Sequence, residues 1–345
     1  MFHIGLDCHK LSSVAVVLNW NGKKLTTKSF PTSSDELLEF IKAYTVLDET
    51  RLVFEAGRQS SHLYNKFQMP DLECYVVCPR QVKLIAETKK KNDRRDARTL
   101  ARLSYTDGLP ERVYIPDDKG RRQRHLVSQR EALVKQRTAV INASYGLAAA
   151  NGIIVPKGYF TRQSGWSDVM KRAMNSNVYD IFVTNYAVWK HLSESIAFTE
   201  GQLKEIFHDD DRVRLMQTMP GVGDAVAWSI LAYIQNINRF AKQNQLVAYA
   251  GLNASQRSSG ETERRGHISK EGPAIMRKMM VQAALGALAS EQPNAEPLKK
   301  FCNRIKVRKG WPVARVALAT HMLKILFYIL KNEKAYNPYN NPKAV

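Results

Sequence analysis

Two carboxylates, Asp93 and Asp96, stand three residues apart in a basic stretch that begins a predicted helix. Residues at this spacing project from one face of a helix. A solvated helix start would also place acids here, near the positive end of the helix dipole. Two further acids, Asp7 and Glu55, each lie at or just beyond the end of a short apolar run typical of a strand. Four carboxylates in a strongly basic chain suggest divalent metal ions held against a phosphodiester.

The charge of the chain points to a polyanionic partner. The 345 residues include 52 basic and 32 acidic side chains, which gives a net charge of +20. This balance favours nucleic acid first and an anionic membrane surface second, and it predicts strongly salt-dependent binding. The apolar content of 44% is that of a globular protein rather than a disordered one.

The cysteines and the apolar segments indicate a soluble protein in a reducing compartment. The four cysteines form no paired C-x-x-C pattern, so we expect neither a zinc site nor a disulfide framework. The first residues lack the basic start and apolar core of a signal peptide. The longest apolar stretch, 316–330, contains His321 and Lys324 and is too short to span a bilayer. We therefore expect a core helix there and no membrane association.

The N-terminal part is patterned as a mixed sheet covered by helices. Phe2, Ile4 and Leu6 share one face of the first strand, and Gly5 on the other face is expected to leave open space beside Asp7. Three strands come first, and a helix and then alternating strands and helices follow. This order predicts three antiparallel strands followed by parallel βα units. The predicted strands cover 2–7, 13–18, 24–30, 51–54 and 73–77, and the predicted helices begin near 34, 61 and 79.

A second, longer helix follows the one that begins near Asp93. It covers about 119–150, with apolar residues at heptad spacing on one face and arginines on the other. Residues 151–180 lack a clear pattern and suggest a loop or a variable insertion, whereas the acidic run 209–211 is typical of a helix end or cap. We expect residues 151–211 to be a helical connector able to form an intermolecular coiled coil. The predicted domains are 1–150, 151–211 and 212–336, followed by a flexible tail, 337–345.

The last domain opens with Pro-Gly-Val-Gly before a small, apolar helix. This resembles a helix-hairpin-helix turn, in which backbone N–H groups at Gly221 and Gly223 would hold a phosphate. A simple tight turn is the alternative. A polar loop, about 256–270, then precedes two predicted helices, 273–289 and 311–330, and a basic patch lies between these helices. The patch includes Lys306, Arg308 and Lys309.

The order of the elements and of the acids resembles a ribonuclease-H-like nuclease domain of the RuvC type. The acids occur in Gly-Leu-Asp-Cys-His-Lys, Phe-Glu-Ala-Gly and Asn-Asp-Arg-Arg-Asp-Ala-Arg. Further along, Met-Pro-Gly-Val-Gly, Ala-Tyr-Ala-Gly-Leu, Ser-Ser-Gly and Gly-His-Ile-Ser-Lys-Glu-Gly follow in order. Together these motifs resemble the DEDD insertion-sequence transposases related to the Piv DNA invertase, which are bridge-RNA-guided recombinases. The resemblance covers nearly the whole chain except 151–211.

The resemblance implies an insertion-element transposase, a site-specific DNA recombinase that cuts and rejoins strands. It implies that the four acids hold Mg²⁺ or Mn²⁺, and that the family's nucleophilic serine corresponds to Ser259, directly before a glycine. The neighbouring Ser258 stays open as the alternative nucleophile. The chain departs from the family pattern after Gly251-Leu252, where the common Pro and Arg are absent.

The resemblance also implies partners. These are target and donor DNA, a non-coding bridge RNA that supplies sequence specificity by base pairing, and further copies of the chain in a dimer or tetramer with composite active sites. The expected setting is the cytoplasm of a prokaryote, at the nucleoid. The expected nucleic-acid contacts are Lys89, Lys90, Lys91, Arg94, Arg95, Arg121, Arg122, Arg124, Gly221, Gly223, Arg264, Arg265, Lys306, Arg308 and Lys309.

Two other functions stay open from the sequence. A metal-dependent, junction-resolving endonuclease would use the four acids with water and would form no covalent intermediate. A non-catalytic RNA- or DNA-binding protein derived from a transposase is the other alternative. The presence of all four acids and of the Ser259-Gly260 pair argues against this second alternative.

Overall fold

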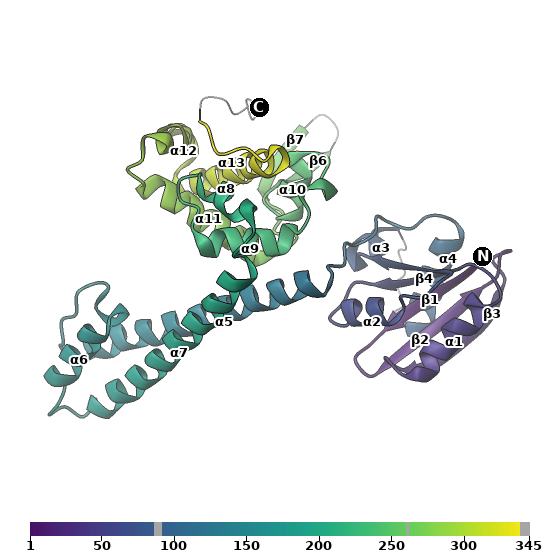
Figure 1. Cartoon of the computed structure of the whole chain (residues 1–345), viewed down its shortest axis with the longest axis horizontal. Helices are drawn as coiled ribbons and strands as arrows, with labels where there is room; N and C mark the ends of the chain where they lie inside the picture. Colours follow the sequence, from purple (N-terminus) through teal and green to yellow (C-terminus); the bar gives the residue numbers. More distant parts are fainter. Residues whose placement is uncertain (86–91, 260–261, 339–345) are drawn as a thin grey trace. The chain divides into compact units, whose positions relative to one another are not determined.

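The computed structural model describes residues 1–85, 92–259 and 262–338, without the side chains of 256–265. The chain forms two compact units, Met1–Asp117 and Asp118–Val345 (Figure 1). The sequence predicts the first boundary at residue 150. The contacts divide the chain at Asp117 instead, because the long helix that follows packs on other helices of the second unit.

The first unit contains the expected mixed sheet. Its five strands lie in the order β3-β2-β1-β4-β5. The first three strands are antiparallel neighbours, and β4 and β5 run parallel to β1. The strands are β1 (Phe2–Cys8), β2 (Ser12–Leu18), β3 (Lys24–Pro31), β4 (Thr50–Glu55) and β5 (Leu72–Val77).

Helices cover both faces of this sheet. On one face α1 and α2 pack on the predicted apolar face of β1, where Ile4 and Leu6 are fully buried against Leu37 and Leu63. On the other face α4 packs on β1 and β2. Ser34 begins the first helix, because its hydroxyl accepts from the Leu37 N–H at 3.2 Å. The helices of this unit are α1 (Asp35–Thr45), α2 (Ser60–Lys66), α3 (Pro79–Ile85) and α4 (Asp93–Tyr105).

The expectation of open space beside Gly5 is wrong, because α4 fills it. A Cβ atom on Gly5 would lie 2.0 Å from the Ala97 carbonyl oxygen and 2.5 Å from the Ala101 backbone nitrogen. Ala97 and Ala101 are themselves fully buried. The helix therefore approaches the strand backbone to backbone, a distance that only a glycine on β1 and small residues on α4 permit.

Substituting Gly5→Ala should therefore destabilise the first unit. We expect a loss of about 1–3 kcal/mol, because the added methyl group must displace the backbone of α4. The loss would be measured by urea unfolding of the full chain, together with hydrogen exchange in peptides covering β1 and α4. Gly57→Ala is the matched control, because no atom lies within 4 Å of a Cβ there. Equal stability of the two variants would contradict the close contact.

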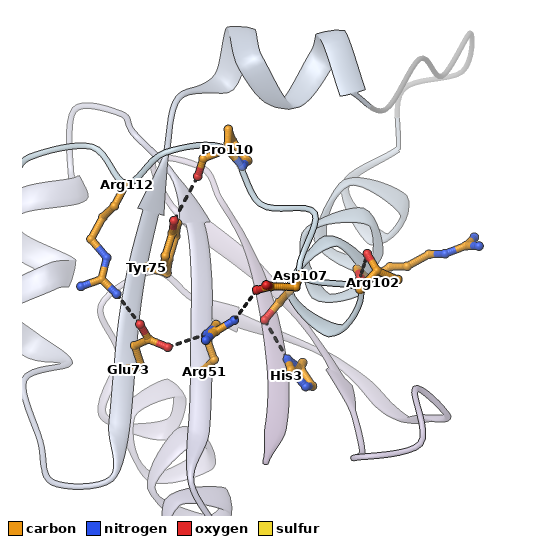
Figure 2. A network of polar contacts seen from close by, with 10 residues as sticks. His3, Arg51, Glu73, Tyr75, Arg102, Asp107, Pro110 and Arg112 are labelled. Carbon is orange, nitrogen blue, oxygen red and sulfur yellow. Dashed lines mark hydrogen bonds and ion pairs between the residues drawn. The ribbon is translucent and has the colours of Figure 1, made fainter.

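Polar contacts stabilise the end of the sheet at which β4 and β5 begin (Figure 2). Arg51 donates to Glu73 at 2.5 Å, and Arg112 donates to the same carboxylate at 2.6 Å. The Arg51 guanidinium also lies 3.6 Å from Asp107, directly after α4. Tyr75 donates to the Pro110 carbonyl at 3.1 Å. Together these contacts tie the segment that follows α4 to the strands β4 and β5.

The buried His3 imidazole completes the attachment of α4 at this end. Its Nδ1 atom lies 2.8 Å from the Ser104 hydroxyl. Burial, reinforced by the nearby Arg51 charge, lowers the pKa of His3 below its ordinary value of 6.5. The folded protein therefore favours the neutral ring.

This lowered pKa predicts acid sensitivity of the first unit. Below pH 6.5 the unfolded chain protonates His3 while the folded chain resists protonation, so stability falls as the pH falls toward the folded pKa. Above pH 6.5 both states are neutral and the effect disappears. The test compares urea midpoints of the wild type and His3→Gln between pH 5 and pH 8. The advantage of the wild type should shrink on acidification, and a constant difference would contradict this account.

The second unit is mainly helical (Figure 1). Its N-terminal helix α5 (Asp118–Ala150) pairs with α7 (Tyr179–Ile206) along much of its length. The helices that follow α7 share one large apolar core. They are α8 (Asp211–Gln217), α9 (Asp224–Ile234), α10 (Gln243–Tyr249), α11 (Ala274–Ala289), α12 (Glu296–Lys309) and α13 (Trp311–Asn332).

Three segments of this unit differ from the sequence prediction. Residues 151–180 contain α6 (Gln163–Arg172) and part of an aromatic core, in which Phe160 and Trp166 are fully buried together with Phe182 of α7. The polar loop near 256–270 is mostly a hairpin of β6 (Ala254–Ser259) and β7 (Thr262–Ile268). The basic patch between two helices is itself the helix α12. The apolar residues of α12 do follow a helical spacing, as Leu298, Phe301, Cys302 and Ile305 show, whereas the hairpin lacks the apolar alternation of a strand.

Two other expectations for this unit are confirmed. The acidic run caps a helix, because Asp210 accepts from the Arg212 N–H at 3.1 Å at the start of α8. The apolar stretch 316–330 lies in α13. By length and composition α13 could cross a membrane, but more than half of its apolar window is buried inside the protein, as in a core helix.

Candidate active site

Asp7 and Asp93 meet because α4 runs antiparallel to β1 across the face of the sheet. Three contacts fix the alignment, namely His3 with Ser104, Gly5 with Ala97 and Ala101, and the Asp7 region with the start of α4. A strand rises about 13 Å over the four residues from His3 to Asp7. A helix rises about 16 Å over the eleven residues from Asp93 to Ser104. The strand and helix segments are similar in length, so the close contact at Gly5 brings Asp93 to the carboxyl end of β1.

The start of α4 is well defined, and this fixes its first turn. The Asn92 side chain accepts from the Arg94 N–H at 3.0 Å and so caps the helix. Asp93 and Asp96 lie in that first turn, where the helix dipole stabilises negative charge. The helix-start interpretation therefore describes both acids, and the metal-site interpretation stays a prediction for them.

A histidine that the sequence analysis did not select lies between the two acids. The Nε2 atom of His9 is 3.3 Å from Asp7 Oδ2 and 3.2 Å from Asp93 Oδ1. The side chains are 18% exposed for Asp7, 43% for His9 and 50% for Asp93. One potential ligand atom from each residue lies within 4.8 Å of the other two. The signal available in the sequence was the spacing, because residues two apart at a strand end share a face.

Glu55 reaches the same edge of the sheet by strand register. β1 and β4 are parallel with Leu6 beside Phe54, so the next residues, Asp7 and Glu55, end neighbouring strands. Asp96 lies one helical turn before Leu100, which packs with Val53 of β4. This places Asp96 on the side of α4 that faces β4. Within the described residues, the compact group of potential ligand atoms comprises Asp7, His9 and Asp93, without Glu55 or Asp96.

The cysteine between Asp7 and His9 takes no part in this group. Cys8 lies against the apolar core under α1, on the other face of the strand. Burial raises the pKa of its thiol to about 12, so it stays protonated at neutral pH. A protonated thiol is a poor metal ligand and a poor nucleophile.

The serine candidates lie in the second unit. Ser258 and Ser259 end β6, where Ser259 pairs with Thr262 across the hairpin. Their side chains, those of Arg264 and Arg265, and the residues Lys89, Lys90 and Lys91 lie outside the described residues.

Several basic residues selected from the sequence are exposed, and others make contacts within the protein. Arg124 donates to the Ala232 and Tyr233 carbonyls at 3.0 and 3.1 Å, so it stabilises the end of α9. Arg121 pairs with Asp118. The exposed residues among the selected set are Arg94, Arg95, Arg122, Lys306, Arg308 and Lys309.

The Pro-Gly-Val-Gly turn packs tightly against α11. Gly221 has φ +84°, and a Cβ atom on it would lie 2.1 Å from the Ala283 carbonyl oxygen. Gly223 precedes α9 and has open space around it. The two glycines therefore differ, because Gly221 allows close helix packing whereas Gly223 does not contact the core.

This difference can be tested with two alanine substitutions. We expect Gly221→Ala to cost about 2 kcal/mol or more, from the positive φ and the clash with α11. Gly223→Ala should cost less than about 1 kcal/mol, the usual effect of alanine at a helix N-cap. Urea unfolding followed by circular dichroism measures both. A selective loss of DNA affinity in Gly223→Ala, with stability unchanged, would support a phosphate contact at the turn.

A basic chain with an acid-lined strand edge and a separate helical unit suggests an enzyme that processes nucleic acid. Comparison with known proteins supports this class. Residues 4–147 match a family model for DEDD transposases of the IS110 type, described as "Transposase". Residues 213–299 match the model described as "Transposase IS116/IS110/IS902 family". The first match spans the four acids, and the second spans the Pro-Gly-Val-Gly turn and the serine hairpin.

Curated relatives agree with both matches. The chain is 25% identical over 311 residues to the transposase for insertion sequence element IS1111A of Coxiella burnetii, covering 86% of this chain and 82% of the relative. It is 23% identical over 257 residues to a probable family 20 transposase of Pseudomonas aeruginosa, covering 72% and 75%. It is 25% identical over 286 residues to the putative transposase y4qE of Sinorhizobium fredii, covering 81% and 70%. The chain belongs to the IS110/IS116 family of insertion-sequence transposases.

Proposed function

We propose that this transposase cuts and rejoins DNA at a metal-bound carboxylate site on the first unit, with Ser259 as the nucleophile. The observation that carries the proposal is the convergence of Asp7 and Asp93, which are 86 positions apart in the sequence, at one edge of the sheet. Glu55 and Asp96 complete the set from the neighbouring strand and from the same helix turn. The sheet order β3-β2-β1-β4-β5 supports a ribonuclease-H-like domain of the RuvC type.

The residues fit a divalent cation. Carboxylate oxygens are the ligands that Mg²⁺ and Mn²⁺ prefer, and Asp7 is mostly buried while its neighbour Asp93 is open to solvent. The four acids would hold the ion or ions, which supply Lewis-acid activation and stabilise charge on the phosphate oxygens. The surrounding arginines, among them the exposed Arg94 and Arg95, attract a polyanion to a site whose own acids would repel it.

In the proposed reaction, the Ser259 hydroxyl oxygen attacks a DNA phosphorus atom. A bond forms between Oγ and phosphorus, the bond from phosphorus to one deoxyribose oxygen breaks, and the hydroxyl proton passes to solvent while that deoxyribose oxygen gains one. The phosphoserine ester keeps the energy of the original phosphodiester. The exchanged strand can therefore be rejoined by the reverse attack without ATP.

We further propose the partners that the family resemblance implies. A bridge RNA would pair with target and donor DNA, while the protein would recognise backbone and shape, in keeping with its net charge of +20. The acids of one copy would work with the serine of another in a dimer or tetramer. We also propose that the turn at Gly221 and Gly223 is a helix-hairpin-helix turn whose backbone N–H groups hold a DNA phosphate. Recovery of the protein with its enriched RNA from cells carrying the element tests the RNA part.

The nucleophile can be tested by trapping the covalent intermediate. Incubation of the full protein with a labelled element-end DNA, Mg²⁺ and the co-purified RNA should give a protein–DNA species that survives denaturation. Ser259→Ala should abolish this species, with a loss of activity of at least about a thousandfold. Ser258→Ala is the matched control and should retain it.

The alternative is a nuclease that uses water at the same acids. It is favoured if Ser259→Ala still hydrolyses branched DNA while Asp7→Asn and Glu55→Gln do not. Retention of recombination in Asp7→Asn would instead rule out the carboxylate site. The exposed acid Glu39 on α1 provides the control substitution Glu39→Gln, which should leave every activity unchanged.

A further inference from the structure

We propose that His9 is a nitrogen ligand of the catalytic metal, and that it gives the site a preference for Mn²⁺ over Mg²⁺. The proposal rests on the carboxylate metal site of the proposed function and adds a residue outside the four acids. Its basis is the position of one imidazole nitrogen, which faces two carboxylates that come from different elements of the first unit.

The distances fit the coordination shell of one ion. Adjacent ligands of a six-coordinate ion bound at about 2.1 Å lie about 3.0 Å apart. His9 Nε2 is 3.3 Å from Asp7 Oδ2 and 3.2 Å from Asp93 Oδ1. The ligand atoms of all three residues fall within 4.8 Å of one another, close to the span across such an ion. Small side-chain shifts would therefore bring the three groups around a common centre.

The backbone of His9 is held at several points, so the imidazole approaches the acids from a defined position. The His9 N–H donates to the Ser12 carbonyl at 2.9 Å. The Thr32 hydroxyl donates to the His9 carbonyl at 2.8 Å and lies 2.8 Å from the Ser13 hydroxyl. The end of β3 thus fixes the tight connection between β1 and β2. A ligand held in this way binds with little loss of conformational freedom.

The chemistry of the donors predicts the metal preference. Mg²⁺ is a hard ion that favours oxygen ligands and retains several waters. An imidazole nitrogen instead favours first-row transition ions, and Mn²⁺ accepts carboxylates as well. Two carboxylates with one imidazole therefore suit Mn²⁺ better than Mg²⁺.

The same distances also fit an imidazolium ion paired with both acids. In that arrangement His9 would neutralise the acids without any metal, and it would have to leave when an ion binds. The two arrangements differ in one observable property. Only direct ligation gives a sizeable isotropic hyperfine coupling between bound Mn²⁺ and an imidazole nitrogen.

Pulsed EPR of Mn²⁺ bound to the full-length protein provides the test. We expect coupling to an imidazole nitrogen in the wild type and its loss in His9→Ala. Calorimetric titration should show at least about a tenfold loss of Mn²⁺ affinity in His9→Ala, because even outer contacts to a metal site are worth that much. Mg²⁺ affinity should change much less. His62→Ala, at an exposed histidine on α2, is the control and should match the wild type.

Two results would overturn the proposal. One is the absence of imidazole coupling in the wild type when Mn²⁺ is bound, and the other is coupling that persists in His9→Ala. Asp7→Asn separates this failure from failure of the proposed function. If Asp7→Asn loses Mn²⁺ and His9→Ala keeps it unchanged, only the role of His9 is wrong. If Asp7→Asn also binds Mn²⁺ as the wild type does, the carboxylate site itself is wrong.

Discussion

The close approach of α4 to β1 is the contact on which the candidate site depends. At Gly5 the strand has no side chain, and the Ala97 and Ala101 backbone fills the space that a Cβ atom would need. The antiparallel alignment then follows, with His3 beside Ser104 at one end and Asp7 beside Asp93 at the other. A shift of α4 along the strand would separate the acids. The site is therefore positioned by backbone packing more than by any contact among the acids themselves.

The second unit contains the same kind of close contact between a glycine and a helix backbone. Gly221 lets the turn before α9 approach the backbone of α11 at Ala283, as Gly5 lets α4 approach β1. In both units a glycine serves helix packing. This accounts for Gly5 and Gly221 on structural grounds, independently of any phosphate contact. It also separates Gly221 from Gly223, which contacts nothing in the core.

The predictable part of the fold is the part with strong local signals. The strands of the first unit alternate or are uniformly apolar, and Ser34, Asn92 and Asp210 cap helices in the usual way. Prediction failed where tertiary contacts replace local pattern. The aromatic core at Phe160 and Trp166 lies at one end of the α5–α7 pair, where the end of α5, the connecting segment and the start of α7 pack together. The β6–β7 hairpin is polar, so its sequence lacks the apolar alternation that marks a strand.

By itself, the sequence determined the residue types available for chemistry, the four acids and their placement at strand ends and a helix start, and the charge that attracts nucleic acid. Periodicity and capping act over a few residues, so these features can be recognised locally. The tertiary structure alone decided that α4 fills the space at Gly5, that His9 lies between Asp7 and Asp93, and that Arg124 stabilises the end of α9. Each of these depends on how segments distant in the chain pack, and packing is set by the shape and volume of side chains on both partners.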